Sequence, residues 1–266
     1  MRTFVINMQT AKERLKFMDK QLSSLWIEYE VFPAFIWKNL TKEEIWKYYD
    51  KEKSIETLWE ELTLWEIWCA LSHMWIYKKM VDDNIPIALV LEDDAVINPK
   101  IKEIYDKIWK KKIEQLNSYF DYMTMNYSLI NFEKFINYVK SVTKKFINER
   151  KIFKLIIYLV GSLVFFILDQ LFNTIGNVFW PIIVPKYKPL YLTWWYFITL
   201  NWAKKLLWVN DKIFVQADLI QELFYKKIWL KFWCVFPLLV KQNEVFKPQI
   251  TWRDNLNLNK NISFEE

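Results

Sequence analysis

The stretch that decides the fold is residues 86–94, which reads Pro-Ile-Ala-Leu-Val-Leu-Glu-Asp-Asp. Its first six residues contain no polar side chain, which is typical of a central strand buried on both faces of a parallel sheet. The run ends abruptly in three adjacent carboxylates, Glu92, Asp93 and Asp94. Ligands bind at the carboxyl ends of strands in open α/β sheets, so these three residues are the first candidates for a functional site.

Strand and helix patterns alternate around this stretch. A capping-box pattern at Thr63 and Glu66 predicts the start of a helix, and a second such pattern begins at Thr41. Periodicity predicts strands over 3–7, 27–32 and 119–125, and helices over 10–25, 63–81 and 203–207. This alternation predicts an α/β fold with a doubly wound sheet flanked by helices.

Composition narrows the class of protein. The chain has 266 residues, 53% of them hydrophobic, which excludes disorder. Two cysteines exclude a disulfide framework or a cysteine-based zinc module, and a single histidine, His73, excludes a multi-histidine metal site. The first seven residues contain no apolar signal region, so we expect a cytoplasmic, reduced protein. The net charge of +6 suggests an acidic surface or substrate.

Much of that charge lies in one segment. Residues 133–154 contain seven basic and two acidic residues, and residues 155–168 contain no charge at all. Such a pair of segments is typical of attachment to an anionic membrane surface, because fourteen uncharged residues are too few for a confident span. A membrane span and a buried core helix are the alternatives. We therefore expect a basic and apolar helical insert over 128–190, between parts 1–127 and 191–266 of one domain, and a peripheral membrane location.

Glycine and tryptophan counts are abnormal. The chain has 2 glycines and 16 tryptophans, whereas about 7% glycine is usual. Several tryptophans, such as Trp37 and Trp194, stand where a turn or tight bend calls for glycine. We hypothesise that many of these codons are UGA, which the source organism reads as glycine. The alternative is a truly tryptophan-rich protein.

The carboxylate triplet favours metal chemistry. In an extended strand Glu92 and Asp94 would point to one side, which suits Mg²⁺ or Mn²⁺ shared with phosphates. The alternative is a solvated acidic loop. His73 lies four residues after Cys69 and shares its helix face, although a lone helical histidine is more often structural. A Cys69–His73 nucleophile and base pair is formally possible, but an apolar-flanked cysteine is more often inert.

A family resemblance appears when Trp65 and Trp68 are read as glycine. Residues 62–73 then become Leu-Thr-Leu-Gly-Glu-Ile-Gly-Cys-Ala-Leu-Ser-His, and with the carboxylate triplet this resembles glycosyltransferase family 25, of the lipooligosaccharide galactosyltransferase type. Further segments resemble the family in the same order: residues 5–8 with Arg14, 196–207, 216–218 and 237–242. The likeness covers residues 3–127 and 191–255 but not 128–190.

The resemblance implies a GT-A-like mixed sheet, an activated sugar such as UDP-galactose, inversion at the anomeric carbon, and a lipid-linked or surface glycan acceptor. It implies Mn²⁺ or Mg²⁺ held by Asp94 with Glu92, and no nucleic-acid partner. The residues expected to contact the nucleotide sugar are Asn7, Arg14, Glu92 and Asp93. Arg14 could equally be a surface residue of its helix.

The proton of the acceptor hydroxyl needs a base. Asp218 is favoured slightly over His73, because inverting transfer commonly uses a carboxylate. The rival functions are a catalytically inactive, membrane-associated relative and a metal-dependent phosphohydrolase built on the three carboxylates.

Overall fold

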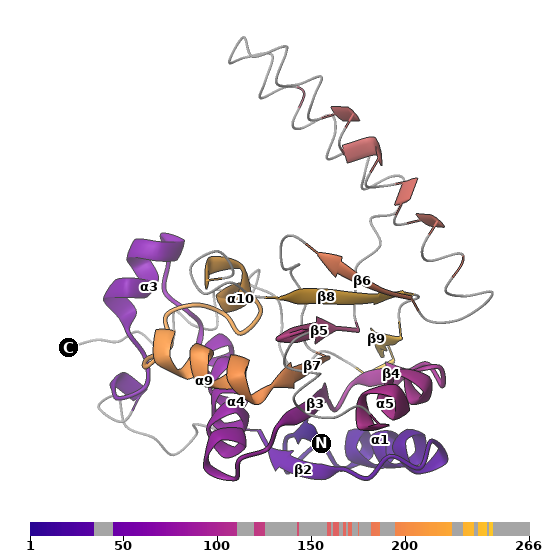
Figure 1. Cartoon of the computed structure of the whole chain (residues 1–266). Helices are drawn as coiled ribbons and strands as arrows, with labels where there is room; N and C mark the ends of the chain where they lie inside the picture. The colour runs from indigo at the N-terminus through magenta and orange to yellow at the C-terminus, as the bar shows by residue number, and fades with distance from the viewer. Residues whose placement is uncertain are drawn as a thin grey trace.

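The computed structural model describes residues 1–34, 45–110, 120–125, 182–186, 195–224, 231–236, 239–243 and 245–246, with residue 143 and isolated positions between 159 and 175. Its described part is organised around a mixed seven-stranded sheet in the order β2-β1-β3-β7-β5-β8-β6 (Figure 1). The strands are β1 (Arg2–Asn7), β2 (Glu30–Pro33), β3 (Ile87–Glu92), β5 (Tyr122–Thr124), β6 (Ile182–Lys186), β7 (Tyr196–Thr199) and β8 (Phe232–Phe236). The expected α/β class with a GT-A-like mixed sheet is therefore confirmed.

The apolar run of residues 86–91 forms the centre of the sheet, as expected. β3 is parallel to β1, with Val5 opposite Leu91, and antiparallel to β7, with Leu89 opposite Phe197. The run is typical of a parallel sheet, and here it lies in the mixed sheet that the resemblance implies, with one parallel and one antiparallel neighbour. A second small sheet pairs β4 (Ala95–Ile97) with β9 (Val240–Gln242), directly beyond the carboxylate triplet.

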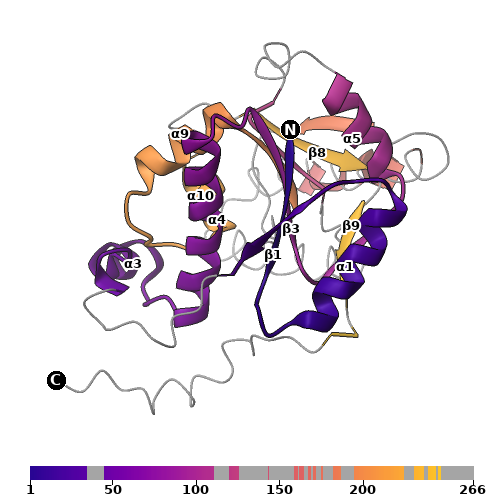
Figure 2. The same ribbon diagram turned by 90° about the horizontal axis from the view of Figure 1, so that it is seen from below.

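Helices cover both faces of the main sheet (Figure 2). Leu89 and Leu91 face a core shared with α1 (Lys12–Ser24) and α5 (Ile101–Lys110). Ala88 and Val90 face the opposite core, shared with α4 (Leu64–Asp82), α9 (Leu200–Val209) and α10 (Leu219–Phe224). Successive strand side chains point to opposite faces, so an all-apolar β3 is what two cores require.

Helix α4 begins where its sequence predicts. The Thr63 side chain accepts from the Glu66 backbone N–H, and the Glu66 carboxylate accepts from the Thr63 backbone N–H at 2.8 Å. This reciprocal pair satisfies two donors that a helix end otherwise leaves open. The helix carries Cys69 and His73 toward the end of β3. The capping pattern at Thr41 lies outside the described residues. α3 (Lys51–Leu58) precedes α4 and is capped by Asp50.

Two boundaries differ from the sequence expectations. The second strand begins at Glu30, not residue 27, and its Val31 is 41% exposed. β2 is an edge strand that pairs, among the described strands, only with β1, so its side chains are covered less than the alternation predicts. Strand β6 lies within the range expected to form the insert, and it pairs with β8 at the far edge of the sheet. Residues 182–186, which were expected to belong to the insert, therefore form part of the main sheet.

Three described residues have positive φ, and two of them are tryptophans: Trp26 (φ 54°) and Trp59 (φ 65°), with Asn84 (φ 51°) as the third. Trp26 follows α1, where its N–H donates to the Ser23 carbonyl and the Ile27 N–H donates to the Leu22 carbonyl. This is the Schellman ending, which strongly favours glycine or asparagine at that position. Asn84 makes the equivalent ending after α4. The glycine hypothesis thus gains physical support at Trp26 and Trp59.

The tryptophans singled out from sequence have other surroundings. Trp65 and Trp68 lie within α4 with their rings 4.5 Å apart, and the Trp68 indole N–H has no hydrogen-bond partner among the described residues. Trp195 and Trp202 are fully buried, and the Trp202 indole N–H donates to Gln221 at 2.8 Å. Trp37 and Trp194 lie outside the described residues.

Candidate active site

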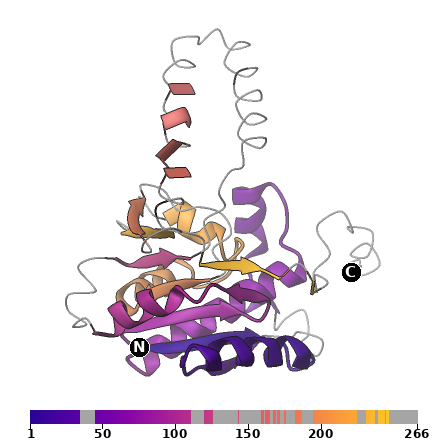
Figure 3. The same cartoon turned by 90° about the vertical axis from the view of Figure 1, so that its right-hand side faces the viewer.

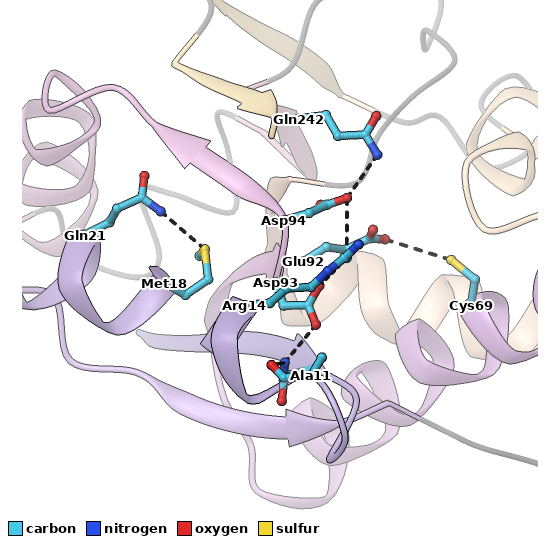
Figure 4. A network of polar contacts seen from close by, with 10 residues as sticks. Ala11, Arg14, Met18, Gln21, Cys69, Glu92, Asp93, Asp94 and Gln242 are labelled. Carbon is cyan, nitrogen blue, oxygen red and sulfur yellow. Dashed lines mark hydrogen bonds and ion pairs between the residues drawn. The ribbon is translucent and has the colours of Figure 1, made fainter. Parts of the chain in front are cut away.

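The candidate site lies where β3 ends, and the carboxylates there diverge. β3 stops at Glu92, and Asp93 and Asp94 form a turn leading into β4. Because the chain is no longer extended there, the alternation expected for Glu92 and Asp94 does not apply. Glu92 instead faces α4, whereas Asp94 faces β9 and α1 (Figure 4).

Asp93 is held by residues from two other elements. Its carboxylate accepts from the Asn7 side-chain amide at 2.7 Å and from the Arg14 guanidinium at 2.9 Å. The Arg14 side chain is only 11% exposed, so the alternative of a surface residue is wrong. Separating a buried ion pair of this kind is costly, because each partner would be left as an unpaired buried charge. The pair therefore holds α1 against the end of β3. The three residues therefore join β1, α1 and the end of β3.

Asp94 is buried with one carboxylate oxygen unused. Its Oδ2 accepts from the Gln242 amide at 2.9 Å and lies 3.8 Å from the Arg14 guanidinium. Its Oδ1 has no hydrogen-bond partner among the described residues, although the side chain is only 9% exposed. Burial raises the pKa of Asp94, while Gln242 and Arg14 act against that shift. Oδ1 is thus an acceptor that a ligand could use.

Glu92 belongs to a separate cluster with two residues of α4. Its Oε1 lies 3.9 Å from the Cys69 sulfur and 3.4 Å from His73 Nε2. Burial raises the pKa of Glu92 well above its ordinary value, and the neighbouring Asp94, Asp93 and Asp218 raise it further. Burial likewise raises the pKa of the Cys69 thiol. The cluster therefore favours neutral groups in the absence of a cation.

His73 is held from its other side by tyrosines. Its Nδ1 lies 2.6 Å from the Tyr196 hydroxyl, which lies 2.9 Å from the Tyr77 hydroxyl. His73 is 2% exposed, and burial lowers its pKa to about 4. The imidazole is consequently neutral at physiological pH, with Nε2 directed at Glu92.

Asp218 comes to the same region from the turn before α10. It is half-buried, and its negative charge raises the pKa of His73, Glu92 and Cys69. The turn is tied to the start of α4, because the Gln216 amide donates to Glu66 at 2.9 Å. The two candidate bases, Asp218 and His73, thus belong to one electrostatic cluster.

Sequence reasoning gave no role to Gln242, Tyr196 or Tyr77. Gln242 and Tyr196 lie in segments that carried the family resemblance, which was the available signal. Tyr77 has the spacing of the Cys69–His73 face, four residues further along α4. The contacts of these three residues join positions more than one hundred residues apart, and such contacts produce no local sequence pattern.

The mixed sheet flanked by helices, with an acidic turn at the end of β3, has a GT-A-like α/β architecture. The family model for glycosyltransferase family 25, described as an LPS biosynthesis protein, matches residues 1–221. The chain belongs to this family.

Individual relatives share a shorter stretch with the chain. A "Glycosyltransferase 25 family member" of Drosophila melanogaster is 32% identical over 110 residues, which is 38% of this chain. A protein of the same description from Aedes aegypti is 30% identical over 107 residues, or 37% of the chain. Each match spans 17% of the relative's own length, so it bears on part of those proteins.

Proposed function

We propose that the chain transfers a hexose, galactose from UDP-galactose, to a hydroxyl of a lipid-linked or surface glycan with inversion at the anomeric carbon. The observation that carries this proposal is Asp94 Oδ1, a buried oxygen at a strand end without a hydrogen-bond partner among the described residues. It lies on the side chain that approaches Arg14, the cation that also pairs with Asp93.

A divalent cation fits this oxygen chemically. Carboxylate oxygens are the ligands of Mg²⁺ and Mn²⁺, and Asp94 offers one that the described residues leave open. Asp94 would hold the ion, whereas Glu92, the second carboxylate expected from sequence, faces Cys69 and His73 of α4 instead. The chemistry of the ion there would be neutralisation of the departing diphosphate.

The chain's own residues provide the rest of the reaction. The acceptor oxygen bonds to the anomeric carbon as the carbon–phosphate oxygen bond breaks, and the bonding electron pair leaves with UDP. We assign the hydroxyl proton to Asp218, which is half-buried, in preference to His73, which is 2% exposed and already engaged by Tyr196. Asn7 and Arg14 fix Asp93, and Arg14 and Asp93 are the proposed contacts to the nucleotide.

Transfer of radiolabelled galactose and release of UDP test the proposal with and without Mn²⁺. We expect metal-dependent UDP release from UDP-galactose that Asp94→Asn abolishes. Asp218→Asn should lower kcat at least 100-fold, the range of a lost general base, whereas His73→Asn should lower it less. Equal turnover by the Asp218 variant and the wild type would exclude Asp218 as the base. No UDP release from any UDP-sugar would overturn the proposed activity.

Attachment to an anionic membrane surface is the second part of the proposal. Six described apolar side chains, spaced by three and four residues, are 37–58% exposed: Val160, Leu163, Val164, Ile167, Leu168 and Leu171. The described pieces between residues 159 and 175 are drawn away from the sheet (Figures 1 and 3). No helix among the described residues is both long enough and apolar enough to cross a membrane. The basic stretch 133–154 lies outside the described residues, apart from residue 143.

Vesicle flotation tests the attachment. The wild type should float with anionic vesicles, less so at high salt, and Val164→Asp/Ile167→Asp should reduce flotation. Val245→Asp is a matched control, since Val245 is 87% exposed but lies outside the segment. A wild type that ignores anionic vesicles would refute this part without affecting the transferase proposal.

A further inference from the structure

A second group of potential metal ligands lies beside the carboxylate turn. Cys69, His73 and Glu92 each offer one ligand atom, and these atoms all lie within 4.8 Å of one another. We propose that this cluster binds Zn²⁺ through the Cys69 sulfur, His73 Nε2 and Glu92 Oε1. The inference does not depend on the proposed transfer reaction, because it rests on these three side chains alone.

The spacing of the ligand atoms fits a tetrahedral ion. Zinc bonds of about 2.0–2.3 Å at tetrahedral angles place neighbouring ligand atoms about 3.3–3.6 Å apart. The structure has His73 Nε2 at 3.4 Å from Glu92 Oε1, and the Cys69 sulfur at 3.9 Å from the same oxygen.

The fold supports this set of ligands on two rigid elements. Cys69 and His73 are four residues apart on α4 and therefore lie on the same face of one helix. Glu92 is the last residue of β3, in the centre of the main sheet. Figure 4 shows Cys69 and Glu92 directed toward each other from these two elements.

The outer contacts of His73 suit a metal ligand. A ligating histidine usually makes a hydrogen bond through its other ring nitrogen, which fixes the ring and its tautomer. Here the Tyr196 hydroxyl lies 2.6 Å from His73 Nδ1, and the Tyr77 hydroxyl in turn lies 2.9 Å from that of Tyr196. Nε2 is thereby directed at the cluster.

The donor set selects the ion. A thiolate and an imidazole prefer Zn²⁺, whereas Mg²⁺ and Mn²⁺ prefer oxygen ligands of the kind that Asp94 offers. Glu92 is 23% exposed at its side chain, whereas His73 is 3% exposed, so solvent approaches from the Glu92 side. This cluster would supply three protein ligands and leave the fourth position open to solvent. A zinc site with an exchangeable fourth ligand has this arrangement.

Cobalt substitution provides the most direct test. Co²⁺ added to the full, metal-free chain in a non-thiol reductant should give the visible bands of a tetrahedral ion and a near-ultraviolet thiolate charge-transfer band. Cys69→Ser should abolish the charge-transfer band, while Cys234→Ser, at the other cysteine on β8, should keep it. Competition with a chromophoric chelator should show one Zn²⁺ per chain. Zinc affinity should fall at least tenfold in Cys69→Ser and His73→Asn.

Further variants separate the two metal sites and guard against misfolding. Asp94→Asn should retain the cobalt spectrum, because Asp94 is not among the three ligands. Circular dichroism of the metal-free variants checks that each one folds, and only folded variants enter the comparison. An octahedral spectrum without a thiolate band would overturn the proposal. The proposal would also be overturned if Asp94→Asn or Cys234→Ser lost metal binding while Cys69→Ser retained it.

Discussion

Arg14 contacts both aspartates of the turn, at 2.9 Å from Asp93 Oδ1 and 3.8 Å from Asp94 Oδ2. The guanidinium lies over the Phe246 ring at 5.4 Å as well. One buried cation thus offsets two adjacent carboxylates and ties α1 to the end of β3. The acidic turn can therefore be buried at the centre of the sheet edge.

The first prediction concerns this cation. Arg14→Met should lower the free energy of unfolding by about 3–5 kcal/mol, because it leaves the buried Asp93 charge without its partner. Arg2→Met is the matched control: Arg2 is 48% exposed at its side chain and pairs with exposed Glu30 and Asp83, so about 1 kcal/mol or less is expected. Chemical denaturation measures both. Equal losses of unfolding free energy in the two variants would mean that the Arg14–Asp93 pair stabilises the fold no more than an exposed ion pair does.

The second prediction separates function from stability at Asp94. Asp94→Asn keeps an oxygen acceptor for Gln242. It removes a buried carboxylate, and burial raises the pKa of that carboxyl group. The variant should be as stable as the wild type or slightly more stable, yet metal-dependent turnover should disappear. Thermal unfolding and UDP release measure the two effects. Full turnover at saturating Mn²⁺ would remove Asp94 from the mechanism.

The third prediction tests the glycine hypothesis. Trp26→Gly and Trp59→Gly should each raise the free energy of unfolding by about 1 kcal/mol, because a residue with a Cβ is disfavoured in the left-handed region. Both side chains are exposed, at 87% and 91%, so little packing is lost. Trp208→Gly provides a control of opposite sign. Trp208 is 78% exposed within α9, where glycine should cost up to about 1 kcal/mol. Destabilisation by Trp26→Gly would contradict the hypothesis at that position.

The fourth prediction concerns Glu92 and high pH. Its pKa is raised in the folded state, so its contribution to stability is present below its ordinary pKa and is lost as the pH rises through the folded-state value. Glu92→Gln mimics the protonated carboxyl and should exceed the wild type in stability at pH 8 but not at pH 4. The charged groups that influence Glu92 are Asp93, Asp94, Asp218 and Arg14, and the side chains in contact with it are Cys69 and His73. Unfolding measured across this pH range without added metal provides the check, and parallel curves for the two proteins would refute it.

The fifth prediction concerns His73 and acid. Its pKa is lowered to about 4, so its contribution is complete above pH 6.5 and is lost as the pH falls toward 4. The loss is on the order of 3 kcal/mol for a shift of this size. His73→Asn, which cannot be protonated, should flatten the curve in this window. The groups that face His73 are Glu92, Tyr196 and Asp218. Acid unfolding of the variant with the wild-type slope would exclude His73 as the titrating group.

Much of the fold could be predicted from local pattern. The apolar run of residues 86–91, the Thr63–Glu66 capping box and the helical spacing of 10–25 gave β3, α4 and α1, because each depends on neighbours within a few positions. The edge strand β2 was misjudged at its start, since exposure of an edge is a property of the whole sheet.

The sequence by itself determined the composition of the site: three carboxylates after a buried strand, one histidine, and a cysteine four residues before it. Only the tertiary structure decided which of these groups contact one another. The chain turns after Glu92, so Glu92 meets α4 while Asp93 and Asp94 meet Arg14 from α1. Side-chain direction at a strand end depends on where the backbone stops being extended and on which helices pack there. Those contacts join residues that lie 19 to 148 positions apart in the chain, beyond the reach of any local pattern.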